Sequence, residues 1–491
     1  MKKYVIALDQ STSASKVFLL DKNGSIVQRF SKEHKQFYPA PGYVEHDADE
    51  IYRNVVEGII NVIRGIPTEE IACLSISNQR ETTVLWDRKT GVPVCPAVVW
   101  QDVRGAYITD ELADHAEDVH QKTGIFLSPY FPAAKAAAVF REHPDILKRA
   151  EAGEVCVGTV DSYLIYRLTG CTAFLTDVSN ASRTQLMDLK KLAWDPELLA
   201  LFGIPAAAMA KEIVHSDSDF GEIQVNGIPE GIRITGVMGD SHAALFGNGC
   251  HSAGMAKATY GTGSSVMLNV GSTPVLSSHG LSASVGFGWK GEVCYVLEGN
   301  ITCSGDTLVW LRDEMKMIDS VKDVEAIAAS VPNTEGVQLI PAFSGLGAPY
   351  FDNNARAIIC GINRGTNRAH VIRAALESIA QQDADVLDAM QLDFGAPVRE
   401  IFADGGPASN QLLMQFQADM GSCNVTCASA SELSALGAGY MGGIAAGLYP
   451  SFDEIEERKK ETRSYHPQMS DADRSALRTG WKAAIAQACG K

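Results

Sequence analysis

One pattern of apolar and polar residues occurs twice along this chain, once near its amino terminus and once near its middle. In the first copy, an apolar run at 4–8 is followed by a polar turn and a second apolar run at 17–20. In the second copy, apolar runs at 255–260 and 266–270 are separated by glycine, serine and threonine. Short apolar runs bounded by turn residues are typical of buried strands. The pattern therefore predicts two strand–turn–strand hairpins.

The turns of both predicted hairpins consist mainly of small residues. Short side chains leave the backbone N–H groups and hydroxyls of a turn free to converge on one anion. Two such turns favour a molecule of two related halves that face one cleft, with an anion-binding hairpin in each half.

The rest of the chain alternates between helical and strand-like patterns. Apolar residues recur at three- and four-residue steps over 370–390, which predicts a helix that packs one face on a sheet. Short runs rich in apolar residues at 71–76, 336–340 and 401–403 predict further strands. This alternation indicates the α/β class.

Length and composition agree with a folded protein of more than one domain. The chain has 491 residues, of which 46% are apolar and 21% charged, and such a length suits two or three domains. We place the boundary just before the second hairpin, which gives a domain of residues 1–249 and a domain of residues 250–491.

The charge balance excludes some classes of partner. Fifty-nine acidic residues against 42 basic ones give a net charge of −17, whereas nucleic acids and anionic membranes are bound through clustered lysine and arginine. We therefore expect a small-molecule partner, with no nucleic acid and no membrane. A polyanion such as ATP would have to be held locally by N–H groups, a few basic residues and a divalent cation.

The amino-terminal segment and the cysteines indicate a cytoplasmic protein. Only five consecutive apolar residues precede Asp9, too few for a signal peptide, and no segment approaches the ~20 apolar residues of a membrane span. The 11 cysteines show no zinc or redox spacing, which predicts reduced thiols. A homo-oligomer is compatible with these features.

The turn of the first hairpin contains candidate phosphate and metal ligands. Asp9 ends the first strand, and Thr12, Ser13 and Lys16 follow it. In one interpretation Asp9 helps to hold a hydrated Mg²⁺, while the other three residues face the phosphates of a nucleotide. The alternative is a polar turn that caps a strand end. The second copy of the pattern favours the phosphate-binding interpretation.

A second candidate nucleotide site lies near the carboxyl end of the chain. Gly405 and Gly406 follow the predicted strand 401–403 and precede a helical stretch, and Asn410 lies near the start of that helix. Glycines let the backbone pass close under a flat ligand, so this turn suits adenine and ribose. The alternative is a strand-to-helix turn that needs glycine only for its backbone conformation.

Asp240 follows a predicted strand at 232–238 and precedes an apolar, helix-like stretch. As a general base at the cleft, it would take a proton from an attacking hydroxyl. As a structural residue, it would cap the helix that begins at Ser241. A serine esterase with Ser241 as nucleophile is disfavoured, because its motif does not usually lie at this place in a chain.

Residues suited to a polyhydroxylated ligand follow two other predicted strands. Arg80 and Glu81 place a donor fork beside an acceptor, which suits neighbouring hydroxyls, and Trp100 offers an apolar wall for a carbon backbone. The alternatives are a surface ion pair between Arg80 and Glu81 and a core position for Trp100.

Taken in order, these motifs resemble the FGGY family of carbohydrate kinases, and most closely its glycerol kinase branch. The resemblance extends from Tyr4 to about Leu448. It includes Ser77-Asn78-Gln79-Arg80-Glu81-Thr82-Thr83, Val99-Trp100-Gln101-Asp102, Gly158-Thr159-Val160-Asp161, Thr176-Asp177-Val178-Ser179-Asn180-Ala181-Ser182-Arg183, Tyr260-Gly261-Thr262-Gly263 and Gly345-Leu346-Gly347-Ala348-Pro349-Tyr350, and a C-terminal signature at 357–377.

The resemblance implies two ribonuclease H-like domains of the actin-like ATPase type, which flank a central cleft and close around ATP, Mg²⁺ and a small polyol or sugar. It makes Asp240 the base, and we assign Asp9 and Asp240 to the metal. Matching substrate positions are Arg80, Glu81, Trp100, Tyr130 and Asp240. Matching nucleotide positions are Thr12, Ser13, Lys16, Thr262, Gly305, Gly406 and Asn410.

Six positions depart from the pattern of glycerol kinases. Serine stands where they usually carry glutamine after the catalytic aspartate (Ser241), and serine stands where they carry an aromatic residue (Ser265). The other four are Ser11 for glycine, Lys16 for arginine, Val309 for glutamine and Ala138 for tryptophan. Both Ser241 and Ser265 fall in the implied substrate pocket, where they add space and hydroxyl groups. We therefore expect a substrate of four or five carbons, with glycerol as the competing candidate.

A different class of function shares part of this pattern. An actin-like clamp that hydrolyses ATP to act on a protein partner would need both hairpins and the glycine turn. It would give no reason for Arg80, Glu81 and Trp100 to accompany Asp240, so the kinase interpretation is favoured.

Overall fold

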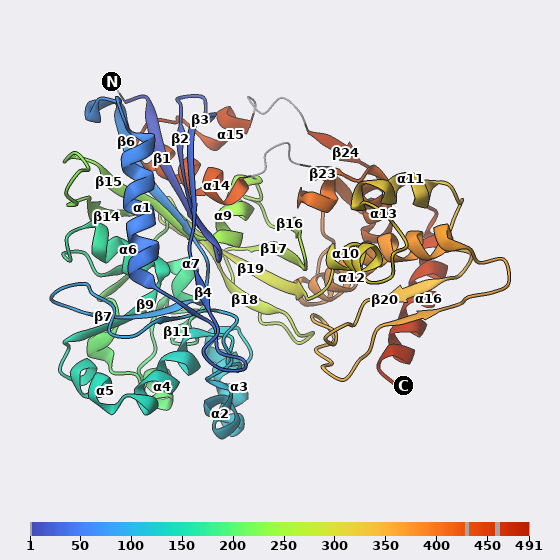
Figure 1. The fold of residues 1–491 in the computed structure, drawn as a ribbon, viewed down its shortest axis with the longest axis horizontal. Helices are drawn as coiled ribbons and strands as arrows, with labels where there is room; N and C mark the ends of the chain where they lie inside the picture. Colours follow the sequence, from blue (N-terminus) through green and yellow to red (C-terminus); the bar gives the residue numbers. More distant parts are fainter. Residues whose placement is uncertain (1, 428–431, 457–461, 491) are drawn as a thin grey trace.

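The two predicted hairpins lie at the centres of two separate mixed β-sheets. The computed structural model describes residues 2–427, 432–456 and 462–490. The first hairpin is β1 (Tyr4–Gln10) with β2 (Ala14–Leu20), and the second is β16 (Met255–Tyr260) with β17 (Ser264–Gly271). Figure 1 shows one sheet in each half of an elongated molecule.

The central strands follow the same order in both sheets. The first sheet runs β14-β15-β6-β1-β2-β3 and the second runs β18-β19-β17-β16-β22-β23-β24. In each sheet the hairpin continues on one side into a third antiparallel strand and on the other into two parallel strands. The other strands are β3 (Ile26–Glu33), β6 (Ile71–Asn78), β14 (Asp219–Glu222), β15 (Arg233–Gly239), β18 (Ser282–Trp289), β19 (Glu292–Ile301), β22 (Glu400–Gly405), β23 (Asn424–Cys427) and β24 (Arg463–Tyr465).

Helices cover both faces of the first sheet, which explains the unbroken apolar run of β1. Ile6 and Leu8 face a core formed with α1 (Ala48–Val62) and α6 (Val160–Leu168). Val5 and Ala7 face the opposite core, formed with α9 (Asp240–Gly247) and α14 (Leu433–Ala445). Successive residues of a strand point to opposite faces, so both parities must be apolar when both faces are covered.

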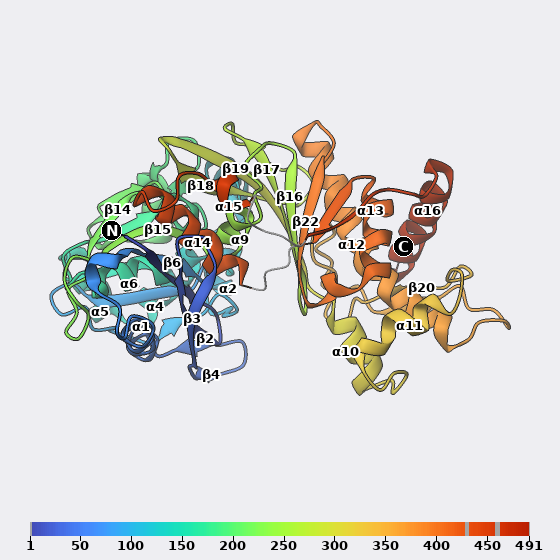
Figure 2. The same cartoon turned by 90° about the horizontal axis from the view of Figure 1, so that it is seen from above.

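Helix α14 belongs to the far end of the sequence but packs on the first sheet. It contacts β6, β15, β1 and α9, and Figures 1 and 2 both show it beside the amino-terminal strands. The chain therefore returns to the first half after it has built the second sheet. A division of the chain at residue 249 stays a prediction. In the sequence, α14 follows that position, whereas the strands that it covers precede it.

The second sheet packs around the helix that the sequence predicted at 370–390. This helix, α12 (Arg368–Phe394), is capped by Asn367, whose side chain accepts from the Ala369 N–H. The sequence predicts one packed face, but buried residues occur all around α12. The reason is that β20, the sheet, α10, α11 and α13 all pack against it. These neighbours are α10 (Asp306–Asp313), α11 (Val324–Ala329), α13 (Gln411–Gly421) and β20 (Gln338–Ile340).

A smaller sheet of the first half has the order β4-β5-β8-β7-β9. Its strands are β4 (Gln36–Phe37), β5 (Glu45–His46), β7 (Thr83–Asp87), β8 (Ala97–Val98) and β9 (Val155–Thr159). The remaining strands are β10 (Leu175–Asp177), β11 (Met187–Asp188), β12 (Ala193–Trp194), β13 (Glu212–Val214) and β21 (Ile358–Cys360). The remaining helices are α2 (Ala106–Glu111), α3 (Ala116–Thr123), α4 (Pro132–Glu142), α5 (Pro144–Glu151), α7 (Val178–Ala181), α8 (Pro196–Phe202), α15 (Phe452–Glu456) and α16 (Asp471–Ala488).

All 11 cysteines lie among the described residues and none is in a disulfide, in agreement with the predicted reduced thiols. Among residues 2–427, 432–456 and 462–490, no helix combines the length and the apolar character needed to cross a membrane.

The close approach of α14 to α9 depends on glycine. A Cβ atom built at Gly437 would lie 1.8 Å from the carbonyl oxygen of Ala243, so Gly437→Ala forces the helices apart. We expect this change to lower the free energy of unfolding by about 1–3 kcal/mol, the usual cost of overpacking, as measured by urea denaturation.

Gly480 in α16 is the matched control, because a Cβ there meets only a side-chain atom of Gln338 at 3.6 Å. Gly480→Ala should leave stability unchanged or raise it by up to about 1 kcal/mol through helix propensity. Equal effects of the two changes would contradict the packing argument.

Candidate active site

The candidate site lies where three parallel strands of the first sheet end. The register pairs Gln10 of β1 with Asn78 of β6, and Asn78 with Gly239 of β15. Parallel strands in register end at the same edge of a sheet. Asp9, Arg80 and Asp240 are therefore brought to one edge, although they lie far apart in the sequence.

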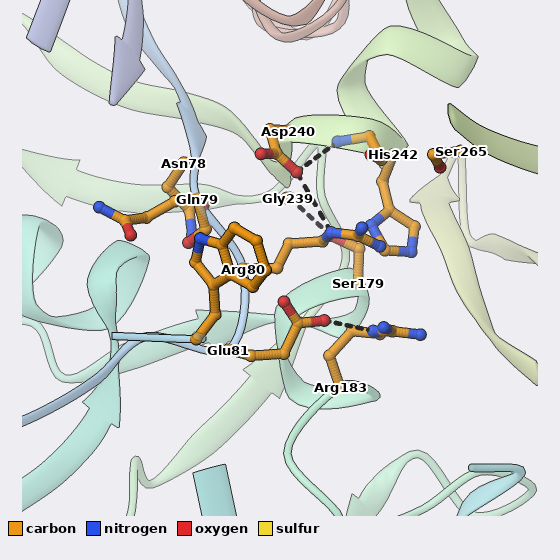
Figure 3. Close-up of polar contacts among 12 residues, drawn as sticks. Asn78, Gln79, Arg80, Glu81, Ser179, Arg183, Gly239, Asp240, His242 and Ser265 are labelled. Carbon is orange, nitrogen blue, oxygen red and sulfur yellow. Dashed lines mark hydrogen bonds and ion pairs between the residues drawn. The ribbon is translucent and has the colours of Figure 1, made fainter. Parts of the chain in front are cut away.

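Asp240 is the first residue of α9 and its side chain is 37% exposed. One of its oxygens, Oδ1, accepts from the Ser241 N–H at 2.6 Å and lies 3.1 Å from Nε of Arg80. The helix begins one residue earlier than expected, and Gly239 precedes it as the N-cap residue. The Asp240 carboxylate therefore bonds an N–H of the first turn and also lies beside Arg80, as Figure 3 shows.

Arg80 and Glu81 are both buried and are not paired with each other, so the surface ion pair is excluded. Glu81 accepts from Nε of Arg183 at 2.6 Å, and Figure 3 shows this pair below Arg80. Glu81 also has a φ of 59°, a left-handed conformation that a glutamate adopts at a cost. The bond to Arg183 offsets part of that cost and fixes the carboxylate in the site.

Glu298 of β19 completes the charge cluster, and sequence reasoning missed it. Its two carboxylate oxygens accept from Nη1 and Nη2 of Arg80 at 2.9 and 2.8 Å. Nη1 of Arg183 lies 3.1 Å from Glu298. Burial alone would raise the pKa of Glu298, but the two guanidinium groups outweigh it and hold the pKa well below its usual range. The only indication in the sequence is an acidic residue inside an apolar strand.

Trp100 and Tyr130 form an aromatic corner beside the first hairpin. Their rings meet edge to face with centroids 5.7 Å apart. The Trp100 Nε1–H donates to the Thr12 hydroxyl at 3.0 Å, which ties this corner to the hairpin turn. Burial raises the pKa of Tyr130, so its hydroxyl remains protonated. Trp100 is half-buried and is therefore not a full core residue.

Lys16 and Asp9 lie together, but the lysine has a second acidic partner. Nζ of Lys16 is 3.7 Å from Asp9 and 3.1 Å from Glu432. Burial, chiefly, raises the pKa of Asp9 to about 6; Lys16 opposes this, whereas Asp240 and Glu432 add to it. Ser13 is exposed at the tip of the same turn. The edge of the sheet thus carries a surplus of negative charge.

The four nucleotide residues expected from the second half lie together. Thr262, Gly305, Gly406 and Asn410 line one pocket of about 430 Å³. The Gly305 N–H donates to the Gly261 carbonyl at 2.9 Å, and a Cβ at Gly305 would lie 2.6 Å from that oxygen. Asn410 caps α13, since its side chain accepts from the Leu413 N–H. Leu308, Val309, Val321 and Leu376 add an apolar wall.

The two serines that depart from the family pattern are both half-buried. The Ser265 hydroxyl donates to Glu298 at 3.1 Å. His242 is fully buried beside Ser284 rather than paired with Ser241, and burial drives its pKa well below the ordinary value. This arrangement supplies no base for Ser241, which excludes the esterase interpretation.

Comparison with known proteins agrees with this geometry. A model of the N-terminal domain of the FGGY family of carbohydrate kinases matches residues 4–247, and a model of its C-terminal domain matches residues 256–446. This chain belongs to the FGGY family. This FGGY kinase is 43% identical over 490 residues to a glycerol kinase of Shewanella piezotolerans, with 99% of each chain covered. It is 44% identical to glycerol kinase 1 of Thermotoga maritima, with 98% of this chain and 99% of that one covered.

Solved structures show the same fold. The crystal structure of a Plasmodium falciparum glycerol kinase with ADP has a TM-score of 0.95 and 33% identity, covering 99% of this chain and 98% of that one. A gluconate kinase from Lactobacillus acidophilus has a TM-score of 0.88 at 21% identity, covering 100% and 97%. The predicted pair of actin-like, ribonuclease H-like domains is confirmed. This FGGY kinase is a phosphotransferase that uses ATP and acts on an alcohol group of a small molecule.

The raised pKa of Asp9 gives a pH-dependent prediction. The carboxyl of Asp9 binds its proton more tightly in the folded protein, where its pKa is about 6, than in the unfolded chain, where it is 3.8. Ionised Asp9 therefore lowers the stability of the fold fully above pH 6 and not at all below pH 3.8. Asp9→Asn removes the buried charge and should stabilise the ligand-free protein at pH 7.5 by roughly 2–3 kcal/mol.

Thermal or urea unfolding at several pH values measures this difference, which should shrink as the pH falls through about 6 and vanish near pH 4. A variant that is less stable than the wild type at pH 7.5 would contradict the stated environment of Asp9.

Proposed function

We propose that the phosphate of ATP is transferred across the gap between the two sheets to a hydroxyl held at the edge of the first sheet. The observation that carries the proposal is the placement of Asp240, a half-exposed carboxylate beside buried Arg80 and at the edge of the sheet that also carries Asp9. Phosphoryl transfer depends mainly on positioning and on charge neutralisation, and needs one group to accept the proton. Asp240 has the exposure and the location for that task.

The residues of the first half divide the work of holding the acceptor. Glu81 supplies a hydrogen-bond acceptor and Arg80 supplies hydrogen-bond donors. Buried ion pairs fix the positions of both side chains. Trp100 and Tyr130 form the apolar wall on which a short carbon chain packs. A substrate aligned by these groups presents one hydroxyl to Asp240, which takes its proton as the bond to phosphorus forms.

The second half supplies the nucleotide site. Thr262 offers a hydroxyl, Gly305 and Gly406 offer bare backbone, and the wall that includes Leu308 and Val309 suits a flat base. Thr12, Ser13 and Lys16 approach from the other hairpin, so the two turns hold the phosphates between them.

The acidic edge of the first sheet fits Mg²⁺. Asp9 is buried with a raised pKa, and Asp240 and Glu432 are close enough to add to that shift, so a divalent cation there would relieve the surplus negative charge. Carboxylate oxygens, water and phosphate are the ligands that Mg²⁺ prefers. When bound, the ion neutralises charge on the phosphates. Asp9 and Asp240 are the residues that would hold it. Among the described residues, no group of three His, Cys, Asp or Glu side chains is arranged to hold a metal ion.

The acceptor is a small polyol, and we propose one longer than glycerol. Ser241 adjoins Asp240, and Ser265 is hydrogen-bonded to the partner of Arg80. Each replaces a larger side chain of the glycerol kinase pattern, so the site has more room and two additional hydroxyls. A longer chain regains the lost van der Waals contact and adds hydrogen bonds, whereas glycerol does neither.

Removal of the base gives the most direct test of the mechanism. Asp240→Asn keeps the shape of the side chain but cannot take the proton, so turnover should fall by roughly 10²–10⁴-fold while ATP binding persists. Steady-state kinetics and calorimetric titration with ATP measure the two quantities.

Asp313 is a suitable control, because it is an exposed carboxylate paired with Arg312. Asp313→Asn should leave turnover unchanged. Wild-type activity of Asp240→Asn would refute the role of the base, and loss of ATP binding would show a general structural defect instead.

A substrate panel tests the proposed acceptor. We expect kcat/KM to be higher for erythritol, threitol or a pentitol than for glycerol. Ser265→Phe and Ser241→Gln restore the bulk of the glycerol kinase pattern, and each should shift the ratio toward glycerol by about tenfold or more.

Ser252→Phe adds the same ring at an exposed loop position and should leave the ratio unchanged. An optimum at glycerol in the wild type would refute the longer substrate while leaving the kinase mechanism intact.

A further inference from the structure

Glu298 is bonded to two of the residues assigned to the acceptor, although it comes from the other sheet. It lies on β19 of the second sheet, whose strands β18 and β19 extend over the first half, as Figure 2 shows. Its side chain is completely buried. A buried carboxylate is costly unless it is paired, and Glu298 is paired twice, with Arg80 and Arg183.

The bonds of Glu298 determine where the guanidinium of Arg80 points. Nη1 and Nη2 of Arg80 are each bonded to one oxygen of Glu298, which leaves Nε facing Asp240 at 3.1 Å. A bidentate pair of this kind fixes the plane of the guanidinium as well as its position. Asp240 therefore has a fixed neighbour only because Glu298 holds Arg80 from the opposite side.

The same carboxylate also orients Ser265. Its hydroxyl has one hydrogen, and that hydrogen is donated to Glu298 because an ionised carboxylate can only accept. The Ser265 oxygen is then left with acceptor capacity alone. A substrate group that binds there must be a donor, such as a hydroxyl.

We propose that Glu298 is a positioning residue of the acceptor site, which aligns Arg80 toward Asp240 and commits Ser265 to accept from a substrate hydroxyl. This inference rests on the proposed function, since it takes Arg80, Asp240 and Ser265 as parts of the site that holds the polyol. Together with Ser265 of β17, Glu298 gives the second sheet a share in acceptor recognition, in addition to nucleotide binding.

Glu298→Gln is the decisive variant, because it keeps the size of the side chain but replaces one acceptor oxygen by an amide donor. That amide cannot accept from both Arg80 nitrogens and opposes one of them. We expect kcat/KM for the acceptor to fall by about 10–100-fold, the usual result of a small misplacement in a site. The KM for ATP should change by less than about threefold, because the nucleotide pocket does not include Glu298.

Asp385 provides the matched control for the loss of a buried carboxylate. It is 2% exposed and lies on α12, where it pairs with Arg478 of α16. Asp385→Asn should leave the KM for both substrates unchanged, provided that the assay is run below its melting temperature. Glu298→Asp keeps the charge and is used as well, so that a folding defect of the glutamine variant does not remove the test. Its acceptor kcat/KM should lie between those of the wild type and Glu298→Gln.

A double-mutant cycle tests the link to Ser265. Ser265→Ala should lower acceptor kcat/KM in the wild type and have a smaller effect in Glu298→Gln, because residues that act through one another are not additive. Wild-type acceptor kinetics in both Glu298 variants, or an equal rise in the KM for ATP, would overturn the proposal. Failure of the wild type itself to phosphorylate any polyol would instead refute the proposed function.

Discussion

The site depends on one geometric constraint, the register of three parallel strands in the first sheet. Because β1, β6 and β15 end at the same edge, residues that lie more than two hundred positions apart in the sequence meet there. The second sheet repeats the arrangement, with Tyr260 of β16 paired to Gly405 of β22. Each sheet thus presents one hairpin turn and one strand-to-helix turn.

At the edge of the first sheet, buried charged side chains are stabilised because they form ion pairs with one another. Arg80, Arg183, Glu81 and Glu298 are all buried and all have charged partners. Removing one partner of such a cluster is expensive, since it leaves a buried charge alone. Asp9, at the same edge, is less well compensated, and its pKa is raised chiefly by burial. Strain at a functional site is common when the site must receive a ligand that completes it.

The two halves of the protein share an apolar core, and some of the polar contacts between them involve residues of the candidate site. Arg80 of the first half is bonded to Glu298 of the second. Asn248, at the end of the helix that begins with Asp240, donates to Asp404 just before the Gly405–Gly406 turn. A change in the relative position of the halves would therefore alter the surroundings of Arg80, of α9 and of the Gly405–Gly406 turn together, which is the kind of coupling that a kinase needs to exclude water.

The sequence by itself determined the local elements and the chemistry of the turns. Both hairpins, the strand before Asp240 and the helix at 370–390 follow from apolar periodicity, which depends only on which faces are buried. The ordered motifs identified the family, and they named four residues of the second half that the fold brings to one pocket. Tertiary structure alone decided which charges pair. Nothing in the order of residues shows that Arg80 is bonded to Glu298 rather than to its neighbour Glu81, because ion pairs follow distance in space, and that distance is set by how β19 crosses onto the first half. For the same reason only the folded chain shows that α14 returns to cover the first sheet.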